Sequence, residues 1–524
     1  MDAVIDNDTS LRYGGLKMAV EEVLLKRQVN PGVAIGGLVL WMFVWVAWKS
    51  YSLRVKVDAV GVSPGLFGGW RAMFGFFPRG NDWIAEGYKK FSPTGKWFQI
   101  PSVARYMILP TSPKILEEMM AEAENILSFN EALADKLAIE WTIHPCIKHD
   151  RSHVKLIQTK LSQRLTTILP EVMDELVLAW EENANVGKEW TKVQISDMML
   201  QIVARTTNRM FVGVPLCRNQ EYLDNVIQYA GKVMMMGSIL DCLPRIFRGP
   251  LTNPLMKKSY HYAIMRKHVG HILRERKEKM RELGEEWKDR PDDLIQWVLD
   301  FAVDEKASSE EELIARLLMM NFVSIHTTSE AILQTLYDIG SHPELQPPLH
   351  AEITEILSKD GMCKQSLTKM KKLDSVIRES QRLSPITTVT MVRKAMAPHT
   401  FSDGTHIPAG AWMGAPAAEI QRSNFIPNPT VFDGFRWERM GVENQSSGKA
   451  GKYAAVTTSF DHLVWGHGKY ACPGRFFATT VEKILLSHII ERFEVRCPEG
   501  RPKNKLFGMA CIADPKGVIE LKMR

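Results

Sequence analysis

Hydrophobic residues recur with the spacing of an α-helix over most of the chain beyond residue 77, whereas strand-like alternation is short and localised. Three segments show that alternation, 97–100, 386–392 and 400–411. The last of them contains turn-forming sequences at Asp403-Gly404 and at Pro408 to Gly410. The pattern predicts a mainly α fold with a small β region.

One apolar run, Pro31–Trp48, contains no charged residue and would be about 27 Å long as a helix. Its tryptophans gather toward the C-terminal end, as at a membrane interface. A buried core helix is the alternative, but core helices seldom stay uncharged for so long. We therefore expect residues 1–30 to form an N-terminal tail, residues 31–48 a single transmembrane anchor, and residues 49–524 one folded domain.

Basic residues weakly favour a cytoplasmic position for the domain, because two lie within ten residues before the run and three within ten residues after it. A cleaved signal peptide is disfavoured, since about thirty residues of mixed charge precede the run. This topology would place the glycosylation acceptor at Asn7 in the lumen and leave the one at Asn444 unmodified in the cytosol.

Composition excludes several classes of protein. The chain has 66 basic and 60 acidic residues, spread without a concentrated basic stripe, so nucleic acid is not an expected partner. The seven cysteines are widely spaced without a C-x-x-C pair, which disfavours a disulfide scaffold or a zinc cluster. No strand leads into a glycine-rich phosphate loop, so reducing equivalents would come from another protein.

The longest predicted helix begins near Ser308, where Ser308 and Glu311 form a capping box, and ends at Gly340. Its middle, Leu317–Ile325, is apolar on nearly all faces, but polar residues then crowd the helix: Ser324, His326, Thr327, Thr328 and Ser329. Hydroxyls bonded to carbonyls one turn back and a satisfied core histidine would explain them. The alternative is a polar notch where a ligand or water meets the helix.

A second unusual segment, Trp465–Arg475, surrounds Cys472 with three glycines. Pro473 suits the first position of the helix that follows, so Cys472 is expected at a helix N-terminus. Backbone amides and the helix dipole there lower a thiol's pKa and solvate a thiolate. Such a sulfur could ligate iron, act as a nucleophile or remain inert, and glycines let the backbone approach a flat cofactor.

The two segments together resemble the cytochrome P-450 family of haem-thiolate monooxygenases, whose signature is Phe-x-x-Gly-x-Arg-x-Cys-x-Gly. Gly468, Cys472 and Gly474 match it, while Trp465 replaces the phenylalanine and Tyr470 the arginine. The resemblance implies the cytochrome P-450 fold, with residues 49–524 as the catalytic domain. It also implies a haem b cofactor whose iron has Cys472 as its axial ligand. The implied cofactor-binding residues are Cys472, Arg393, Trp465, Gly466, Gly468 and Gly474.

Two further motifs agree with this resemblance. Glu379 and Arg382 lie at i and i+3 on one predicted helix, where they can pair, and Arg436 follows within Phe432–Trp437. In the family the three residues form a buried structural triad. Removal of one member would leave a buried charge unpaired, at a cost of about 3–5 kcal/mol.

Arg393 follows the second strand-like segment, where the family usually has a propionate-binding arginine; a surface strand arginine is the alternative. The family's Trp-x-x-x-Arg clasp in an early helix is missing. Only Lys148, His153 and Lys155 offer substitute charge near Trp141.

The resemblance also implies roles in oxygen chemistry. Thr327 takes the place of the family's oxygen-site threonine and would deliver protons, while His326 replaces an acidic residue and would relay them. Electrons would come from NADPH through a membrane-bound cytochrome P-450 reductase, with Lys469 and Arg475 in a basic docking patch or simply on a solvated surface.

The chain is most similar to the filamentous-fungal branch of the family, which implies an endoplasmic reticulum protein with its catalytic domain in the cytosol. A bulky lipophilic secondary metabolite, a terpenoid or indole diterpene, is the implied substrate besides O₂, and the adaptable run Met234–Met236 suits such a molecule. Three alternatives stay open: a haem-thiolate isomerase or dehydratase that does not use O₂, a non-catalytic haem sensor, and a haem-free helical scaffold.

Overall fold

The computed structural model describes residues 36, 37, 40, 41, 44, 55–62 and 68–524, except 103, 104, 242, 303, 424, 425, 448 and 449. The chain divides into two compact units, 1–52 and 53–524. The predicted tail and nearly all of the predicted anchor, Pro31–Trp48, lie outside the described residues. Among the residues that are described, no helix is both long enough and apolar enough to cross a membrane.

Helices dominate unit 53–524, as the hydrophobic period predicts. They are α3 (Gly68–Phe91), α4 (Pro113–Ala121), α5 (Phe129–Leu137), α6 (Ile139–Thr142), α7 (Pro145–His149), α8 (Ser152–Leu156), α9 (Ser162–Asn183), α10 (Ile195–Phe211), α11 (Gln220–Asp241), α12 (Arg245–Met256), α13 (Lys258–Leu283), α14 (Leu294–Asp300), α15 (Glu310–Ser341), α16 (Gln346–Asp360), α17 (Lys364–Lys369), α18 (Lys371–Leu383), α19 (Ala417–Gln421), α20 (Arg436–Glu443) and α21 (Arg475–Arg492).

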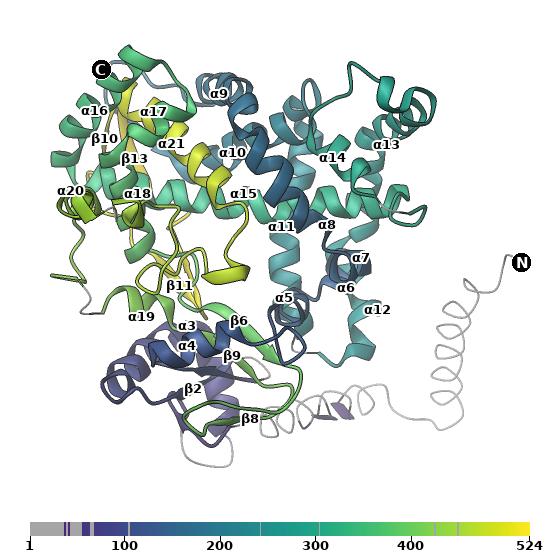
Figure 1. The fold of residues 1–524 in the computed structure, drawn as a ribbon, viewed down its shortest axis with the longest axis vertical. Coiled ribbons are helices and arrows are strands. Elements are labelled where there is room, and N and C mark those ends of the chain that lie inside the picture. The colour runs from purple at the N-terminus through teal and green to yellow at the C-terminus, as the bar shows by residue number, and fades with distance from the viewer. Residues whose placement is uncertain are drawn as a thin grey trace, which may run out of the picture. The chain divides into compact units, whose positions relative to one another are not determined.

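The strands are short and form one larger sheet and three small ones. They are β1 (Asp58–Ala59), β2 (Phe98–Ser102), β3 (Arg105–Leu109), β4 (Leu127–Ser128), β5 (Thr191–Gln194), β6 (Thr390–Ala395), β7 (His399–Thr400), β8 (His406–Ile407), β9 (Trp412–Ala415), β10 (Phe493–Arg496), β11 (Lys505–Phe507), β12 (Ala510–Ile512) and β13 (Val518–Met523). The larger sheet has the order β1-β2-β3-β9-β6-β4. Within unit 53–524 it lies with α3 and α4 at one end, α9 and α10 lie toward the other, and α15 crosses the middle (Figure 1).

The predicted strand segments correspond to β2, β6 and the β7–β8 hairpin, with shifted bounds. β6 begins at Thr390, four residues later than expected, because the backbone before it makes contacts outside the sheet: the Thr388 amide donates to the Met509 carbonyl at 2.8 Å. The segment 400–411 holds only two-residue strands around its turns. Alternation therefore locates the strands but not their ends.

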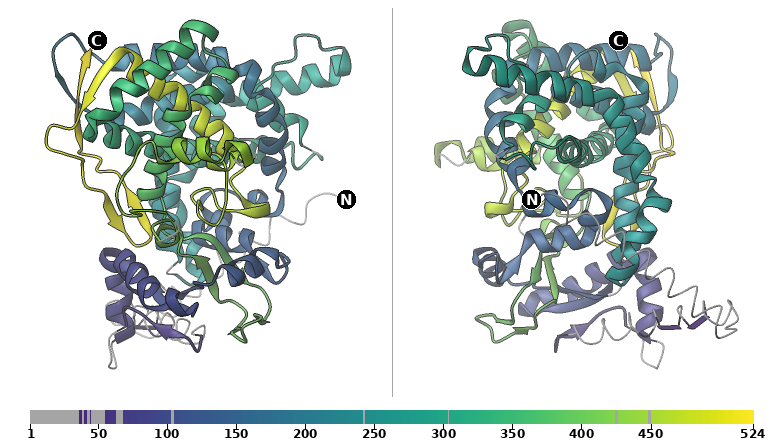
Figure 2. Two further views of the ribbon diagram at one scale, coloured as in Figure 1. Left: turned by 60° about the vertical axis from the view of Figure 1, so that its left-hand side comes forward. Right: turned by 90° about the vertical axis from the view of Figure 1, so that its right-hand side faces the viewer.

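Helix α15 is the axis of the helical part. It contacts α10, α11, α13, α14, α18 and α21, and Figure 2 (right) shows it nearly end on among other helices. The predicted cap is wrong by one residue: Ser309, and not Ser308, accepts the Glu312 amide at 3.4 Å. Ser308 instead donates its hydroxyl to the Glu305 carbonyl. Apolar side chains of α15 belong to the main hydrophobic core, so its backbone is fixed along its length.

Candidate active site

The loop around Cys472 is a tight turn stabilised by its own backbone. The Cys472 amide donates to the Trp465 carbonyl at 2.7 Å, which closes the loop. Gly466 and Gly468 have φ values of 69° and 71°, a region that glycine adopts without strain. Helix α21 begins at Arg475, two residues after the predicted start at Pro473. Cys472 therefore lies just before the helix, where backbone amides remain unpaired.

The backbone amides of Gly474 and Arg475 favour the ionised form of the Cys472 sulfur. The sequence predicts that this environment lowers the thiol pKa, but the pKa of Cys472 is raised. Burial is the largest cause, and the two amides and the Arg475 charge oppose it only in part. The direction of the predicted pKa shift is therefore wrong, because desolvation disfavours the thiolate by more than the two amides favour it, and an added positive charge would be needed to keep the sulfur ionised.

The middle of α15 has one opening in an otherwise covered helix. Between Glu312 and Gly340 only Val323 and Thr327, one turn apart, are exposed. The Thr327 hydroxyl donates to the Val323 carbonyl at 2.8 Å. His326 points elsewhere, since its Nε2 donates to the Ile227 carbonyl of α11 at 3.1 Å. Bonds within the fold, the first alternative drawn from the sequence, thus account for both side chains, and Thr327 in addition lies at the notch.

A pocket joins this notch to the loop around Cys472. Thr327 and Ala331 line it from α15, Ile386 from the segment before β6, Trp465 from the cysteine loop, and Ala478 from α21. These residues are far apart in the sequence and meet only through the fold. Met234–Met236 are not part of this lining: Met236 is buried in a small apolar cluster with Leu240, and Met234 and Met235 are exposed.

Glu379, Arg382 and Arg436 form one hydrogen-bonded cluster in the interior. Arg382 donates to both carboxylate oxygens of Glu379, at 2.9 and 2.7 Å, and Arg436 Nε donates at 3.2 Å. The remaining guanidinium nitrogens donate to backbone carbonyls, including those of Gln421 and Val431. Every charge in this cluster is therefore paired or hydrogen-bonded, which is what burial of ions requires.

Sequence reasoning missed two further donors to Glu379. Trp437 Nε1 donates at 2.9 Å and the Asp433 amide at 3.1 Å. Trp437 directly follows Arg436, a member of the predicted triad. Its indole N–H could therefore have been recognised in the sequence as a further donor to the buried carboxylate. With these donors the Glu379 carboxylate accepts five hydrogen bonds.

Arg393 is buried on β6 without an ion pair. Among the described residues no carboxylate lies within 4 Å of its guanidinium, which donates only to the Val392 carbonyl, at 3.0 Å. Its Cζ lies 4.7 Å from the ring centre of Tyr470 and 5.7 Å from that of Phe129. Burial lowers the pKa of Arg393. A buried cation without a counter-ion is suited to an anionic group supplied from outside the chain.

The three substitute cations proposed from the sequence differ in environment. Lys148 pairs with Glu131 and Glu140 at 3.2 and 2.9 Å, and Lys155 is exposed. His153 is buried at the start of α8, burial lowers its pKa to about 4, and its Nδ1 has no hydrogen-bond partner within the described structure. Of these three residues, only His153 has a buried polar atom that lacks a hydrogen-bond partner within the described structure.

The two basic residues beside the loop also differ. Lys469 is exposed. Arg475 is half-buried, and it donates to the Cys472 carbonyl at 2.8 Å and to the Val456 carbonyl at 3.1 Å. Arg475 therefore fixes the loop, and Lys469, whose ammonium lies 5.0 Å from the centre of the Tyr470 ring, is the more accessible cation of the two.

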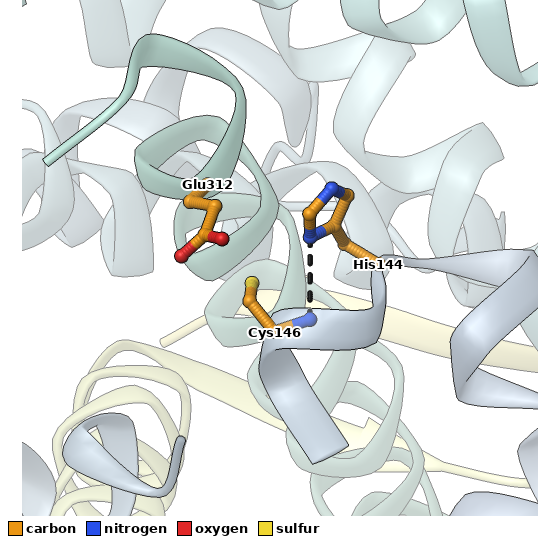
Figure 3. Close-up of side chains that lie close together, drawn as sticks. All are labelled: His144, Cys146 and Glu312. Atoms are coloured by element: carbon orange, nitrogen blue, oxygen red, sulfur yellow. Dashed lines mark hydrogen bonds between the residues drawn. The ribbon is translucent and has the colours of Figure 1, made fainter. Parts of the chain in front are cut away.

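A separate cluster joins the segment before α7 to the first turn of α15. The ligand-type atoms of His144, Cys146 and Glu312 lie within 4.8 Å of one another (Figure 3). Glu312 pairs with Arg316 at 3.3 Å, and burial raises the pKa of the Cys146 thiol to about 12. A protonated thiol and a paired carboxylate account for these residues as packing between the two segments.

Comparison with known proteins settles the family. Residues 73–523 match the family model of cytochrome P-450. The chain belongs to the cytochrome P-450 family. It is 33% identical over 476 residues to cytochrome P-450 monooxygenase 71 of Postia placenta, covering 89% of this chain and 93% of the relative. It is 35% identical to monooxygenase olcJ of Penicillium canescens, covering 84% and 82%.

Two further comparisons add breadth. Ent-kaurene oxidase of Gibberella intermedia is 30% identical, over 91% of this chain and 89% of that protein. The solved structure of retinoic acid bound cyanobacterial CYP120A1 aligns with a TM-score of 0.65 at 17% identity, over 90% of this chain and 100% of that one, and so shares the fold. The protein is a haem-thiolate monooxygenase, and the cofactor of its family is haem with an axial cysteine thiolate.

The site residues fit that cofactor. Two backbone amides favour the ionised sulfur of Cys472, the buried guanidinium of Arg393 lacks a counter-ion among the described residues, and between Glu312 and Gly340 helix α15 is exposed only at Val323 and Thr327. In turn, these features suit ligation of iron by a thiolate, binding of the anionic edge of haem, and an open face for its flat ring.

Proposed function

We propose that this protein is a monooxygenase of fungal secondary metabolism that oxidises a bulky lipophilic substrate, a terpenoid or indole diterpene. The observation that carries the proposal is the pocket lined both by Thr327 of α15 and by Trp465 of the Cys472 loop. It brings a hydroxyl suited to proton transfer and the loop of a thiolate ligand to one space. Similarity to ent-kaurene oxidase supports the terpenoid class.

Cys472 is the axial ligand in this proposal. Gly466, Gly468 and Gly474 keep the loop backbone free of side chains, and Trp465 fixes the loop by donating to the Ala455 carbonyl at 2.8 Å. When bound, haem supplies oxygen activation, which electron donation from the thiolate favours. Arg393 holds a propionate carboxylate.

Thr327 delivers protons. Its hydroxyl hydrogen is used by the Val323 carbonyl, so its oxygen lone pairs are available to a water in the pocket. Rotation about the Cβ–Oγ1 bond then turns the hydroxyl hydrogen from the Val323 carbonyl to that water. His326 is bonded to the Ile227 carbonyl through Nε2, which leaves Nδ1 as the atom for a relay. Glu379, Arg382 and Arg436 act as the structural triad beneath the site.

Electrons come from a NADPH-dependent cytochrome P-450 reductase that docks beside Lys469 through acidic residues. The anchor is Pro31–Trp48, which places the protein in the endoplasmic reticulum membrane with its catalytic domain in the cytosol. Salt should then weaken reductase-supported turnover steeply, since docking between exposed charges is screened. A flat response to salt would contradict docking by charge.

The first experiment is the absorption spectrum of the dithionite-reduced protein with and without carbon monoxide. A strongly red-shifted Soret band that disappears in Cys472→Ser is the expected result. Cys363→Ser, which changes a half-buried cysteine outside the pocket, is the matched control and should keep the band. Absence of the band in well-folded wild type would overturn the assignment of Cys472.

A second experiment tests the substrate class. Diterpenes and indole diterpenes are incubated with the protein, reductase and NADPH, and products are identified by mass. A product that contains one added oxygen and requires NADPH supports the proposal. A rearranged product formed without NADPH or O₂ would favour an isomerase or dehydratase.

A further inference from the structure

Tyr470 stands two positions before Cys472, where the family signature has an arginine. Its hydroxyl donates to Glu124, and the same carboxylate accepts the Ser128 hydroxyl at 2.7 Å and the Asn130 amide at 3.0 Å. Glu124 thus ties the cysteine loop to the segment that begins α5. The tyrosine hydroxyl is fully used in this contact and points at an anion, so it is not a donor for a second anion.

Cations surround the ring of Tyr470. The guanidinium carbon of Arg393 lies 4.7 Å from its centre and that of Arg151 lies 5.9 Å away. Phe129 packs against the same ring, with centres 5.3 Å apart, and forms the other wall beside Arg393. An aromatic face attracts a guanidinium through its quadrupole and holds it in one orientation. Tyr470 is therefore the common contact of two arginines from different parts of the chain.

The positive side chains here are not matched by carboxylates. Among the described residues neither Arg393 nor Arg151 forms an ion pair, and neither group donates to Glu124. Two residues after Arg151, the buried His153 has an Nδ1 without any hydrogen-bond partner. Two arginines over one aromatic ring, neither of them paired with a carboxylate among the described residues, indicate a site for carboxylate groups.

We propose that Tyr470 is a positioning residue that, anchored by Glu124, orients Arg393 and Arg151 to bind the propionate carboxylates of haem. Arg151, with His153 beside it, replaces the arginine missing from the cysteine loop. In this chain the cation thus lies at the start of α8 instead of on the cysteine loop, and the ring of Tyr470 on that loop keeps it in place. This inference rests on the proposed function, because it presumes haem at Cys472.

The experiment measures haem release from the ferric full-length protein to an excess of apomyoglobin, together with the haem reduction potential. Tyr470→Leu removes the ring and should speed haem release about ten-fold, the worth of losing oriented cation contacts. Arg151→Gln should speed release similarly and shift the potential to a more negative value, since a cation near haem favours the added electron. Tyr470→Phe keeps the ring and should have a smaller effect.

Tyr470→Arg separates this inference from a direct role of position 470. An arginine there would pair with Glu124 and repel Arg393, so haem release should be faster than in wild type although the family residue is restored. Slower release than wild type would overturn the proposal. So would release within two-fold of wild type for Arg151→Gln with an unchanged potential.

Control variants show whether a change in haem release comes from the site around Tyr470. Tyr260→Leu, an exposed tyrosine on α13, should release haem at the wild-type rate. Arg151 is only partly buried, so its variant tests the proposal even if Tyr470→Leu fails to fold. Wild-type protein that lacks the red-shifted carbon monoxide band would count against Cys472 itself. Wild type with the band and variants with unchanged release and potential would overturn this inference alone.

Discussion

The protein contains two clusters of buried charge that differ in how completely they are paired. Around Glu379 every ionic group meets a partner within the chain: two arginines, an indole and a backbone amide satisfy one carboxylate. Beside Tyr470, the buried Arg393 has one backbone carbonyl as its only acceptor among the described residues. Arg393 is nearly as inaccessible as Arg382, at 2% and 0% exposure, so burial of the arginine alone does not distinguish the two clusters.

The difference identifies the purpose of each cluster. Internally satisfied charges hold the chain together, because breaking any one leaves the others desolvated and alone. Charges without a partner in the chain cost stability and persist where something else will pair with them. Unpaired polar atoms near a pocket therefore indicate a ligand-binding site better than burial or net charge does.

Glu379→Ala is the most severe test of this distinction. It leaves Arg382 and Arg436 buried without a counter-ion, at a cost of about 3–5 kcal/mol in the free energy of unfolding. We expect little soluble, haem-containing protein, measured by urea unfolding and by the ratio of haem to protein absorbance.

The matched control for that variant is Glu355→Ala. Glu355 also lies in an intrahelical ion pair, with Lys359 at 2.7 Å, but both side chains are exposed. Its removal should leave urea unfolding unchanged, as is usual for exposed pairs. Equal destabilisation by the two changes would mean that burial of the Glu379 cluster adds nothing.

Glu482→Gln tests a third buried group, which is less completely paired than Glu379 and better paired than Arg393. Burial raises the pKa of Glu482 to about 8, although Thr335 and Gln381 donate to it at 2.9 and 3.4 Å. The folded state then keeps a proton that the unfolded state releases above its ordinary pKa of 4.5. This contribution to stability is present below about pH 4.5 and is lost as the pH rises to 8, by on the order of 3 kcal/mol.

The measurement is urea unfolding of wild type and Glu482→Gln at pH 5 and pH 8. The wild type should lose more stability over this range than the variant, because glutamine cannot ionise. Parallel losses in the two proteins would show that Glu482 does not titrate there.

Arg393→Gln should separate cofactor binding from folding. Loss of charge-assisted hydrogen bonds, worth about 1.5–3 kcal/mol, should weaken haem retention roughly 10- to 100-fold. The unfolding free energy of haem-free protein should not fall, because a buried cation without a counter-ion is removed. Arg422→Gln, which breaks a half-buried pair with Glu419, is the control for haem retention. A large loss of stability in haem-free Arg393→Gln would make this arginine part of the internally paired class.

Thr327→Ala is expected to have the smallest effect on structure and a specific effect on chemistry. The variant lacks the hydroxyl that transfers protons. NADPH consumption should therefore continue, while the amount of product per NADPH falls about ten-fold and hydrogen peroxide is released. Thr327→Ser keeps the hydroxyl and should remain coupled. Unchanged coupling in the alanine variant would remove Thr327 from proton delivery.

Residue pattern alone predicted the parts of this site that rest on local rules. The helical period located α15, and the glycines and proline near Cys472 located the start of α21 to within two residues. The pairing of Glu379 with Arg382 followed from i, i+3 geometry. Spacing in a helix fixes which side chains meet, so these features do not depend on distant segments.

Features that depend on long-range contacts could not be predicted. The direction of the Cys472 pKa shift depends on how much protein packs around the sulfur. The bond between Tyr470 and Glu124 joins residues 346 positions apart, and its signal in the sequence was only a tyrosine where an arginine is usual. The cap of α15 is a local miss instead: Ser309, and not Ser308, caps the helix, because Ser308 bonds to the Glu305 carbonyl in the preceding turn.

The exposed pair on α15 sets a limit on regioselectivity. Val323 and Thr327 are one helical turn apart, and the residues next to them along the helix are buried or only partly exposed. One turn spans about 5.4 Å, roughly the width of a single six-membered carbocycle. A polycyclic substrate could therefore present only one ring at a time to this window. The position that is oxidised would then be chosen by the walls that fix how far the molecule slides past α15, and enlarging those walls should redistribute products among neighbouring carbons.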